Sequence, residues 1–287
     1  MRKMKRTPLF IIIIFAALIF PFLALGQQDS WKEVHKDITF TSTELIDYSW
    51  DMREAPNYYK VLGAALISDT ALQPGEYSYA GYDDKGRTLG AAAKMTPTDI
   101  KDAIARERLP FNHDAKKNLI GFSNKQNRKA SIFIPTGKYY QGYFWNRSHL
   151  IADFLGGAPR RYNLVTGTRT QNVGDGSGGM AYAEKKARNW GETHDEGCLS
   201  YYVQPIYKDD ELIPRAVVID MRAEDSTINE RVLVYNCCFG FDINYKTGEF
   251  KKNNDYPNDV PQDNIYIATL SCATIISIIY CAKKKER

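Results

Sequence analysis

Cysteine and histidine are both scarce in this sequence. Five cysteines are too few for a disulfide-rich secreted scaffold, and none has the paired spacing of a zinc site. Cys198 opens one predicted strand and Cys237-Cys238 close another, so a single disulfide bond and buried free thiols remain equal alternatives. Because there are only four histidines, each can be weighed separately as a catalytic group.

The body of the chain also lacks an excess of either charge. There are 38 Lys+Arg against 34 Asp+Glu, and Arg2, Lys3, Lys5 and Arg6 supply the whole difference. Any binding of a polyanion must therefore come from a local patch. One such patch lies between Arg147 and Trp190, where three carboxylates face these cations: Arg147, Arg160, Arg161, Arg169, Lys185, Lys186 and Arg188.

The two ends of the chain differ from its middle. Residues 1–26 combine a positive start, an apolar stretch and a small-residue cleavage site, which is the pattern of a signal peptide. After a polar linker at 251–264, residues 265–282 carry no charge and precede a basic tail at 283–287. This order fits a short membrane-spanning anchor, and a segment packed on the domain is the alternative. We therefore expect an exported protein, either secreted or attached to the outer face of the cell membrane.

Between the ends, the patterns predict an α+β domain. With 44% hydrophobic residues the chain can bury one substantial core. Residues 27–75 form an N-terminal extension without a strong period, and the domain proper is expected over 76–250. The runs after residue 198 predict an antiparallel meander. Runs rich in β-forming residues cover 77–94 around a turn, 131–134, 139–145, 163–169, 199–207, 215–221, 231–239 and 241–245.

Two helices are predicted inside this domain. Thr96 or Thr98 caps the first, which runs to about Arg106. The second follows a glycine-rich loop and covers 180–190, with apolar residues at helical spacing along one side. Glu184 lies on the flank of that apolar stripe, where a carboxylate usually needs a partner.

Phosphodiester hydrolysis needs a general base, a cation that neutralises charge at phosphorus, and basic groups that hold the flanking phosphates. Candidates for all three roles lie between Arg147 and Arg188. His149 stands where a predicted strand ends, shortly before a run of small residues. Taken alone, a single histidine is more often structural than catalytic. His194, with the two acids after it, could bind a cation, but a solvated turn is the simpler interpretation.

Several motifs surround His149, and a further one lies upstream. They are Asn146-Arg147-Ser148-His149-Leu150-Ile151, Leu155-Gly156-Gly157, Tyr162-Asn163-Leu164-Val165-Thr166-Gly167-Thr168-Arg169, Gln171-Asn172-Val173 and Tyr82-Asp83-Asp84-Lys85-Gly86-Arg87. Together they closely resemble the streptodornase and DNA-entry nuclease family of DNA/RNA non-specific endonucleases. The resemblance runs from about Tyr77 to Gly248. It implies a ββα-metal nuclease core on a mainly antiparallel sheet, although Asn146 and Ser148 stand where many relatives carry Asp and Gly.

The resemblance also implies roles for individual residues. The family's general-base histidine corresponds to His149, which is competent as the neutral imidazole, and its metal-binding asparagine to Asn172. Glu184 matches a helix glutamate that orients metal-bound water. The structural alternatives are a helix cap for Asn172 and an ion pair with Arg188 for Glu184. A single amide ligand suits Mg²⁺, with Mn²⁺ as the other choice.

Further residues complete the predicted site. Arg147 anchors either phosphate or the geometry of the site, and Asn163 hydrogen-bonds within it. Arg87, Arg169 and Lys185 are candidates for nucleic-acid binding, and a structural role is equally open for the first two.

The expected activity is cleavage of DNA, and of RNA as an extension, with little sequence preference because the contacts address phosphate. No obligate protein partner is implied. The rival hypothesis is a surface-tethered, non-catalytic nucleic-acid-binding module on a nuclease-like scaffold. The presence of both His149 and Asn172 favours the enzyme.

Overall fold

The computed structural model describes residues 32–33, 39–40, 42–67 and 71–254. The predicted signal peptide, most of the predicted linker, and the predicted anchor and basic tail lie outside the described residues. Within the described part, no helix is both long and apolar enough to cross a membrane.

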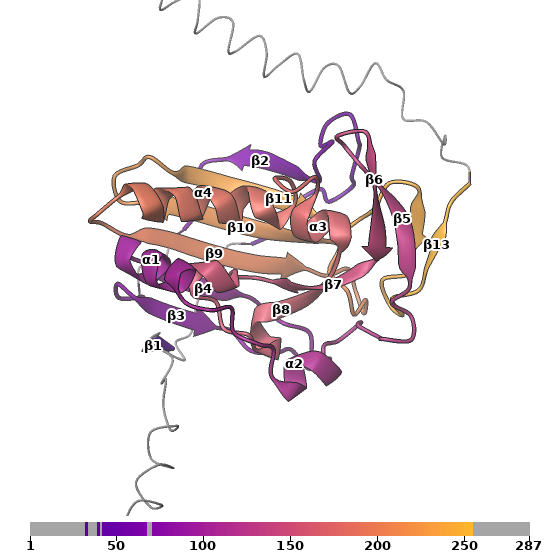
Figure 1. The fold of residues 1–287 in the computed structure, drawn as a ribbon, viewed down its shortest axis with the longest axis horizontal. Coiled ribbons are helices and arrows are strands. Elements are labelled where there is room, and N and C mark those ends of the chain that lie inside the picture. The colour runs from indigo at the N-terminus through magenta and orange to yellow at the C-terminus, as the bar shows by residue number, and fades with distance from the viewer. Residues whose placement is uncertain (1–31, 34–38, 41, 68–70, 255–287) are drawn as a thin grey trace, which may run out of the picture.

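A seven-stranded sheet forms the centre of the molecule (Figure 1). Neighbouring strands are antiparallel, except that β1 runs parallel to β3. Strands β9, β10 and β11 follow one another in the sheet, which confirms the predicted meander. In spatial order the strands are β1 (Lys32–Glu33), β3 (Glu76–Tyr79), β4 (Ala91–Met95), β9 (Leu199–Ile206), β10 (Ala216–Ala223), β11 (Asn229–Tyr235) and β2 (Tyr59–Gly63).

Helices α1 (Pro97–Ala105) and α4 (Met180–Thr193) cover one face of this sheet (Figure 1). Thr96 caps α1, because its hydroxyl accepts from the backbone N–H of Asp99 while the Asp99 carboxylate accepts from the backbone N–H of Thr96. Both predicted helices are confirmed, and α4 continues a few residues beyond the predicted end. Its apolar stripe is buried in the main core, with Met180, Ala183, Ala187 and Trp190 as its members.

The N-terminal extension covers part of the opposite face of the sheet. Trp50 and Tyr48 pack there against alternate residues of β10 and β11, including Val218 and Leu233. Strand β2 adds to the same sheet by pairing with β11. The extension is therefore part of the folded body, which the sequence patterns had left open.

Two small hairpins and a short strand pair extend from the main body. Strands β5 (Lys129–Ile134) and β6 (Lys138–Tyr143) form one hairpin, and β12 (Phe241–Ile243) with β13 (Phe250–Lys252) forms the other. They enclose a second core that includes Ile132, Phe144 and Phe250. Strand β13 carries the folded part slightly beyond the predicted boundary at residue 250.

Phe144 follows β6 and connects it to the region of the predicted site. Strand β7 (Trp145–His149) begins there and pairs with β8 (Leu164–Thr168). Short helices lie on either side along the chain: α2 (His113–Lys117), the 3-10 turns η1 (Asp153–Leu155) and η2 (Arg161–Asn163), and α3 (Arg169–Val173).

The cysteine alternatives are resolved for the described residues. Cys198, Cys237 and Cys238 are all free thiols. Cys198 and Cys238 are buried, and burial raises the pKa of all three thiols. Of the two alternatives, the structure therefore has the free thiols and not the single bridge between these strands, and the thiols behave as small apolar groups of the core.

Candidate functional site

Most of the predicted site residues lie on β7 and on the two helices that follow β8, whereas Asn163 ends the turn before β8 and Arg87 lies between β3 and β4. Strands β7 and β8 are antiparallel, with His149 opposite Leu164. Helix α3 begins directly after β8, and α4 follows the glycine-rich loop at 174–179. This succession of two antiparallel strands and helices matches the ββα order that the family resemblance implied.

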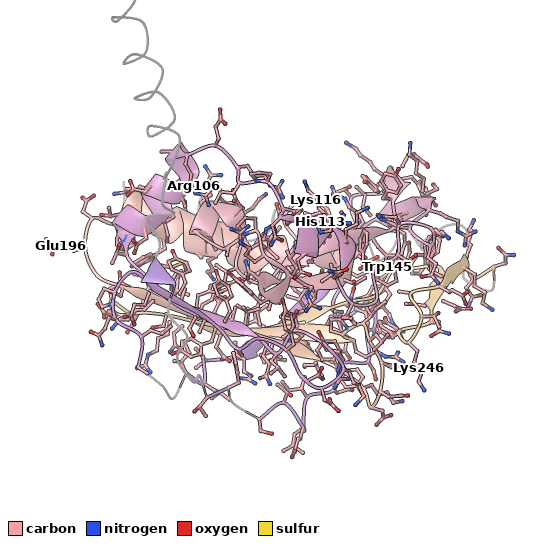
Figure 2. All side chains as sticks on the ribbon, turned by 90° about the horizontal axis from the view of Figure 1, so that it is seen from below. Arg106, His113, Lys116, Trp145, Glu196 and Lys246 are labelled. Carbon is pink, nitrogen blue, oxygen red and sulfur yellow. The ribbon has the colours of Figure 1, made fainter. Side chains whose placement is uncertain are left out.

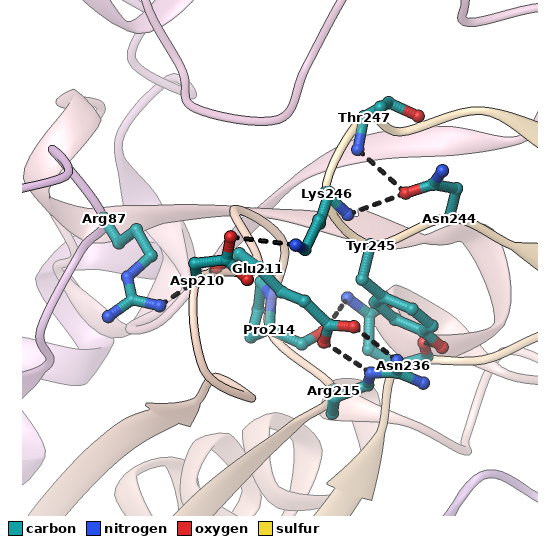
Figure 3. A network of polar contacts seen from close by, with 10 residues as sticks. All are labelled: Arg87, Asp210, Glu211, Pro214, Arg215, Asn236, Asn244, Tyr245, Lys246 and Thr247. Carbon is teal, nitrogen blue, oxygen red and sulfur yellow. Dashed lines mark hydrogen bonds and ion pairs between the residues drawn. The ribbon is translucent and has the colours of Figure 1, made fainter.

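Asn236 fixes β8 against the main sheet. Its amide nitrogen donates to the carbonyl oxygens of Thr166 (3.0 Å) and Pro214 (2.8 Å), and its amide oxygen accepts from the N–H of Thr168 (2.8 Å). Figure 3 shows Asn236 beside Pro214 and Tyr245, whose hydroxyl donates to the Asn236 carbonyl at 2.6 Å. A buried amide with all these bonds satisfied holds the strand in one place. Nothing in the local sequence pattern pointed to this residue.

His149 occupies the last position of β7 and is almost fully buried, with 8% of its surface exposed. Its ring stacks on Phe111 with centroids 5.2 Å apart. Burial first, and the positive charge of Arg108 second, lower the pKa of His149 to about 3. The imidazole is therefore neutral near pH 7. Its Nε2 atom is buried and has no hydrogen-bond partner among the described residues.

Asn172 lies in α3, about one turn after the end of β8, the strand that pairs with β7. Its amide oxygen accepts a hydrogen bond of 3.0 Å from the Ser148 hydroxyl. The helix caps are Thr168 and Gly174, so the alternative role of Asn172 as a cap does not apply. A Cβ at Gly167, on β8, would stand 2.8 Å from the Ser148 Cβ, on β7. Glycine at this position therefore allows β8 to approach β7 closely.

Glu184 projects from the first half of α4 into the body of the protein and is buried. Burial raises the pKa of its carboxyl to about 8, although the positive charge of Arg108 acts in the opposite direction. The charge of Glu184 also contributes to the raised pKa of Tyr201, a buried residue of the sheet beneath. Arg188 pairs with Glu192 at 3.0 Å, so the alternative ion pair with Glu184 is not formed.

Arg108 was missed by the sequence analysis. It is exposed, follows α1, and its charge acts on both His149 and Glu184. These two residues come from different elements, so Arg108 marks the place where β7 and α4 share one electrostatic environment. Arg108 stands outside the motifs, and no spacing rule connects it with either residue.

Arg147 is held by backbone groups rather than left free. Its guanidinium donates to the carbonyl oxygens of Ala115 (3.1 Å) and Lys116 (2.7 Å) at the end of α2. It also lies 4.1 Å from the centre of the Phe122 ring, and burial lowers its pKa. These contacts join β7 to α2 and favour the geometric role over direct phosphate binding.

Asn163 is fully buried and clamps the segment that follows His149. Its amide oxygen accepts from the N–H of Ile151 (2.9 Å), and its amide nitrogen donates to the carbonyl oxygens of Ile151 (2.8 Å) and Ala158 (3.0 Å). The side chain therefore has its hydrogen-bonding capacity occupied by backbone. A Cβ at Gly157 would lie 1.8 Å from the Ile151 carbonyl oxygen, so the clamp requires glycine at that position.

The candidates for nucleic-acid binding differ in how firmly they are held. Arg87 bonds to Asp83 (2.6 Å) and to the carbonyl oxygens of Asp209 and Glu211 (2.9 and 3.0 Å), so it braces the loop drawn in Figure 3. Arg169 lies over the Tyr140 ring at 4.6 Å. Lys185 is exposed on α4 and donates to the Ser177 hydroxyl at 3.1 Å. Lys185 is the most accessible of the three.

The solvated turn at His194 to Glu196 stays outside this region. Figure 2 shows Glu196 at one end of the molecule, far from Trp145 where β7 begins. His194 is hydrogen-bonded to the Trp190 carbonyl (2.8 Å) and paired with Asp225 (2.9 Å). These contacts agree with a structural turn.

The donor set restricts the kind of metal ion that could bind. Among the described residues, no cluster of three or more His, Cys, Asp or Glu side chains is arranged to hold a metal ion. A cation bound by the Asn172 amide oxygen would therefore have at most two such side chains of the described residues beside it and would take its other ligands from water and phosphate. Such a set fits a hard divalent ion that keeps much of its hydration shell.

Comparison with known proteins adds three findings. A model of the DNA/RNA non-specific endonuclease family matches residues 110–225. A deoxyribonuclease of Streptococcus dysgalactiae subsp. equisimilis is 42% identical over 128 residues, which make up 44% of this chain and 39% of the relative. The structure of the Sda1 nuclease with a bound zinc ion is 29% identical, covers 71% of this chain and 100% of that chain, and superposes with a TM-score of 0.64.

These findings overlap the motifs from which the resemblance was predicted. The matched segment contains β7, β8, α3 and α4, and so includes every predicted site residue except Arg87. The mixed α/β architecture with mostly antiparallel strands is shared with Sda1. The chain spans about two-fifths of the length of the curated deoxyribonuclease. Over residues 110–225, the chain is similar to the DNA/RNA non-specific endonuclease family.

Proposed function

We propose that this protein is an exported, metal-dependent endonuclease that hydrolyses phosphodiester bonds of DNA, and of RNA as an extension, without strong sequence preference. The observation that carries the proposal is the buried, neutral imidazole of His149, one residue from the Ser148–Asn172 hydrogen bond. Export and attachment to the cell surface rest on the sequence patterns at the two ends of the chain.

In the proposed reaction, His149 is the general base. Its Nε2 atom, which has no hydrogen-bond partner among the described residues, accepts a proton from the attacking water. The water oxygen bonds to phosphorus, the bond between phosphorus and the 3′ oxygen breaks, and the 3′ oxygen takes a proton from solvent water. The products carry 5′-phosphate ends. A pKa of about 3 makes the free imidazole a weak base. The negative charge of a bound phosphate favours the protonated form, so substrate binding raises the pKa of His149 when the base is needed.

The other residues proposed for the site hold the metal ion or orient a water molecule. Asn172 would hold the divalent ion, Mg²⁺ in the first instance, through the amide oxygen that Ser148 orients. When bound, the ion supplies positive charge opposite the reacting phosphate. Glu184 would orient a water molecule from the buried side, and its buried carboxyl is well suited to a cation-rich surrounding because nearby positive charge lowers its raised pKa. The zinc ion bound to Sda1 supports a divalent cation, and does not decide which one.

Arg108 and Arg147 have different proposed roles. We assign to Arg108, which is exposed and acts on both His149 and Glu184, the role of offsetting phosphate charge. Arg147 positions β7 against α2, and Asn163 fixes the segment after His149.

The test is cleavage of supercoiled plasmid with Mg²⁺ or with EDTA. We expect cutting with Mg²⁺ alone, and a loss of about 10²- to 10⁴-fold in His149→Ala. His113→Ala is the matched control, because His113 is an exposed histidine at the start of α2 and should leave the rate unchanged. Equal cutting by His149→Ala, or an intact plasmid with every divalent ion, would leave the non-catalytic binding module as the better description.

A further inference from the structure

A second cleft lies outside the proposed catalytic site, between the β5–β6 and β12–β13 hairpins. Its volume is about 450 Å³, which is the size of a small-ligand pocket. None of the residues proposed for catalysis lines it. Figure 1 shows the two hairpins side by side at one end of the molecule, beyond the start of β7.

The charge of this cleft has one sign. Arg128 and Lys129 line it from the start of β5, and Lys251 and Lys252 line it from β13. No carboxylate is found among the described residues of its lining. Asp242 pairs with Lys251 at 3.5 Å from outside the cleft, across a solvent-exposed contact that water and salt screen. The cleft is therefore complementary to an anion.

Aromatic rings form much of the remaining lining. They come from Phe133, Tyr139, Phe239, Phe241 and Phe250. Tyr139 is the most accessible, with 53% of its surface exposed, and its ring is supported edge-on by Phe133 at 5.6 Å. Arg128 lies 5.3 Å over the Phe250 ring and donates to the Phe250 carbonyl at 3.2 Å, which ties one hairpin to the other. The rings are thus held in place rather than loosely exposed.

Cations combined with supported rings are what a single-stranded nucleic acid needs. Its phosphates bind lysine and arginine, and its bases, when they are unpaired, stack on aromatic side chains without regard to sequence. A duplex keeps its base faces covered, so it could use only the cations. We propose that this cleft binds single-stranded nucleic acid as an accessory site, away from the place of cleavage. The choice of ligand rests on the proposed function.

Binding is measured by fluorescence anisotropy of a fluorescein-labelled oligothymidylate with the full chain in EDTA, where cleavage is prevented. Lys251→Gln combined with Lys252→Gln removes two cations of the cleft, and Tyr139→Ala removes the accessible ring. Lys138→Gln and Tyr143→Ala are the matched controls, because both are exposed on β6 and lie outside the lining. Thermal unfolding checks that each variant is folded.

We expect the wild type to bind the oligothymidylate more tightly than a duplex of equal length. Tyr139→Ala should weaken binding by roughly fivefold or more. The double lysine variant should lower the salt dependence of log K by about 1.4 for two lost phosphate contacts. The controls should bind as the wild type does.

Wild-type affinity in the cleft variants would overturn the inference, as would a preference for duplex. The inference would also be wrong if the same variants lost binding to anionic phospholipid vesicles while still binding the oligothymidylate. Plasmid cleavage separates this inference from the proposed function. If the wild type cuts plasmid and the cleft variants bind normally, only the accessory site is wrong. If the wild type never cuts but the cleft variants lose binding, only the catalytic proposal is wrong.

Discussion

The main sheet and the β7–β8–α3 region are built from different side chains. Strand β10 is buried along nearly all its length, and the core that it shares with α4 is apolar, including Val217 and Ile219. The side chain of Asp220 alternates with these residues and lies on the other face of β10, where it forms an ion pair with Arg231 at 2.6 Å. In the second region the buried polar side chains are Ser148, His149, Asn163, Thr166, Thr168, Thr170 and Gln171.

This difference separates stability from chemistry. Apolar burial stabilises a fold by about 25 cal/mol for each Å² removed from water, whereas a buried polar group costs free energy unless it is hydrogen-bonded. Most polar groups near the site are satisfied: Thr170 bonds to the Cys237 carbonyl, and Asn163 is fully bonded to backbone. The Nε2 atom of His149 and both polar atoms of the Gln171 amide lack partners among the described residues. We infer that the sheet stabilises the molecule and that the second region keeps polar groups available.

The largest expected effect on stability comes from the sheet. Ile219→Ala leaves a cavity at a position with no exposed surface, so we expect the free energy of unfolding to fall by about 2–5 kcal/mol. Urea denaturation followed by circular dichroism measures this loss. Below its unfolding temperature the variant should retain the wild-type cleavage rate, because none of the residues proposed for catalysis lies on β10. The control is Val61→Ala on β2, which is 42% exposed and should change stability by less than about 0.5 kcal/mol. Equal losses of stability in Ile219→Ala and Val61→Ala would contradict the inference that the buried part of the sheet stabilises the molecule.

A smaller loss is expected where polar bonding itself is structural. Asn163→Ala leaves the buried N–H and carbonyl of Ile151 without their partner, so the free energy of unfolding should fall by about 1–3 kcal/mol. Cleavage should fall as well, since the clamp fixes the segment that follows His149. Asn118→Ala is the control, because its exposed side chain bonds only to Asp114 among the described residues. If the Asn163 variant unfolds at the wild-type urea concentration, Asn163 is not a clamp.

The sequence predicted the parts of the fold that depend on local patterns. The stripe of α4 follows helical spacing, and the Thr96 cap depends on a partner three residues away. Pairing of β2 with β11 could not be predicted, because β2 is mostly exposed and its partner lies far away along the chain. Asn57 is a similar case: its carbonyl accepts from the N–H of Gly179, just before α4, although no motif surrounds it.

The same distinction applies to the site. The motifs pointed to His149 and Asn172, and the helical stripe with the family resemblance pointed to Glu184, but none of these patterns predicted how deeply the three residues are buried. The burial of His149 depends on Phe111 and on the packing of several elements, which only the folded chain defines. Arg108 acts through space on two of these residues and has no motif of its own.

Glu184 links the polar site to stability through pH. Its folded pKa of about 8 lies above the unfolded value, so the folded state keeps a proton that the unfolded state releases from about pH 4.5. The stability that this proton provides is complete below pH 4.5 and is lost as pH rises to 8. Relative to Glu184→Gln, the wild type should therefore become less stable over this range, by about 1.4 kcal/mol for each unit of pKa shift.

Denaturation of both proteins in EDTA at pH 4.5, 6 and 8 measures this difference. The low pKa of His149 gives the plot of stability against pH a slope of the opposite sign. Below about pH 6.5 the unfolded state binds a proton that the buried imidazole does not bind. That slope is common to both proteins and cancels. A difference between wild type and variant that does not change with pH would show that the Glu184 carboxyl titrates normally.

The smallest expected effect distinguishes an arginine proposed to position β7 from a lysine predicted to bind phosphate. Arg147 is bonded to two backbone carbonyls, whereas Lys185 is exposed on α4. Arg147→Gln should lower the free energy of unfolding by about 1 kcal/mol and leave the salt dependence of DNA binding unchanged. Lys185→Gln should leave stability unchanged and reduce the slope of log K against log salt by about 0.9, because one phosphate contact is lost. Duplex binding in EDTA at several salt concentrations measures both slopes. A reduced slope in the Arg147 variant would mean that this arginine leaves its carbonyls to bind phosphate. Arg147 would then belong to the functional polar groups and not to the structural ones.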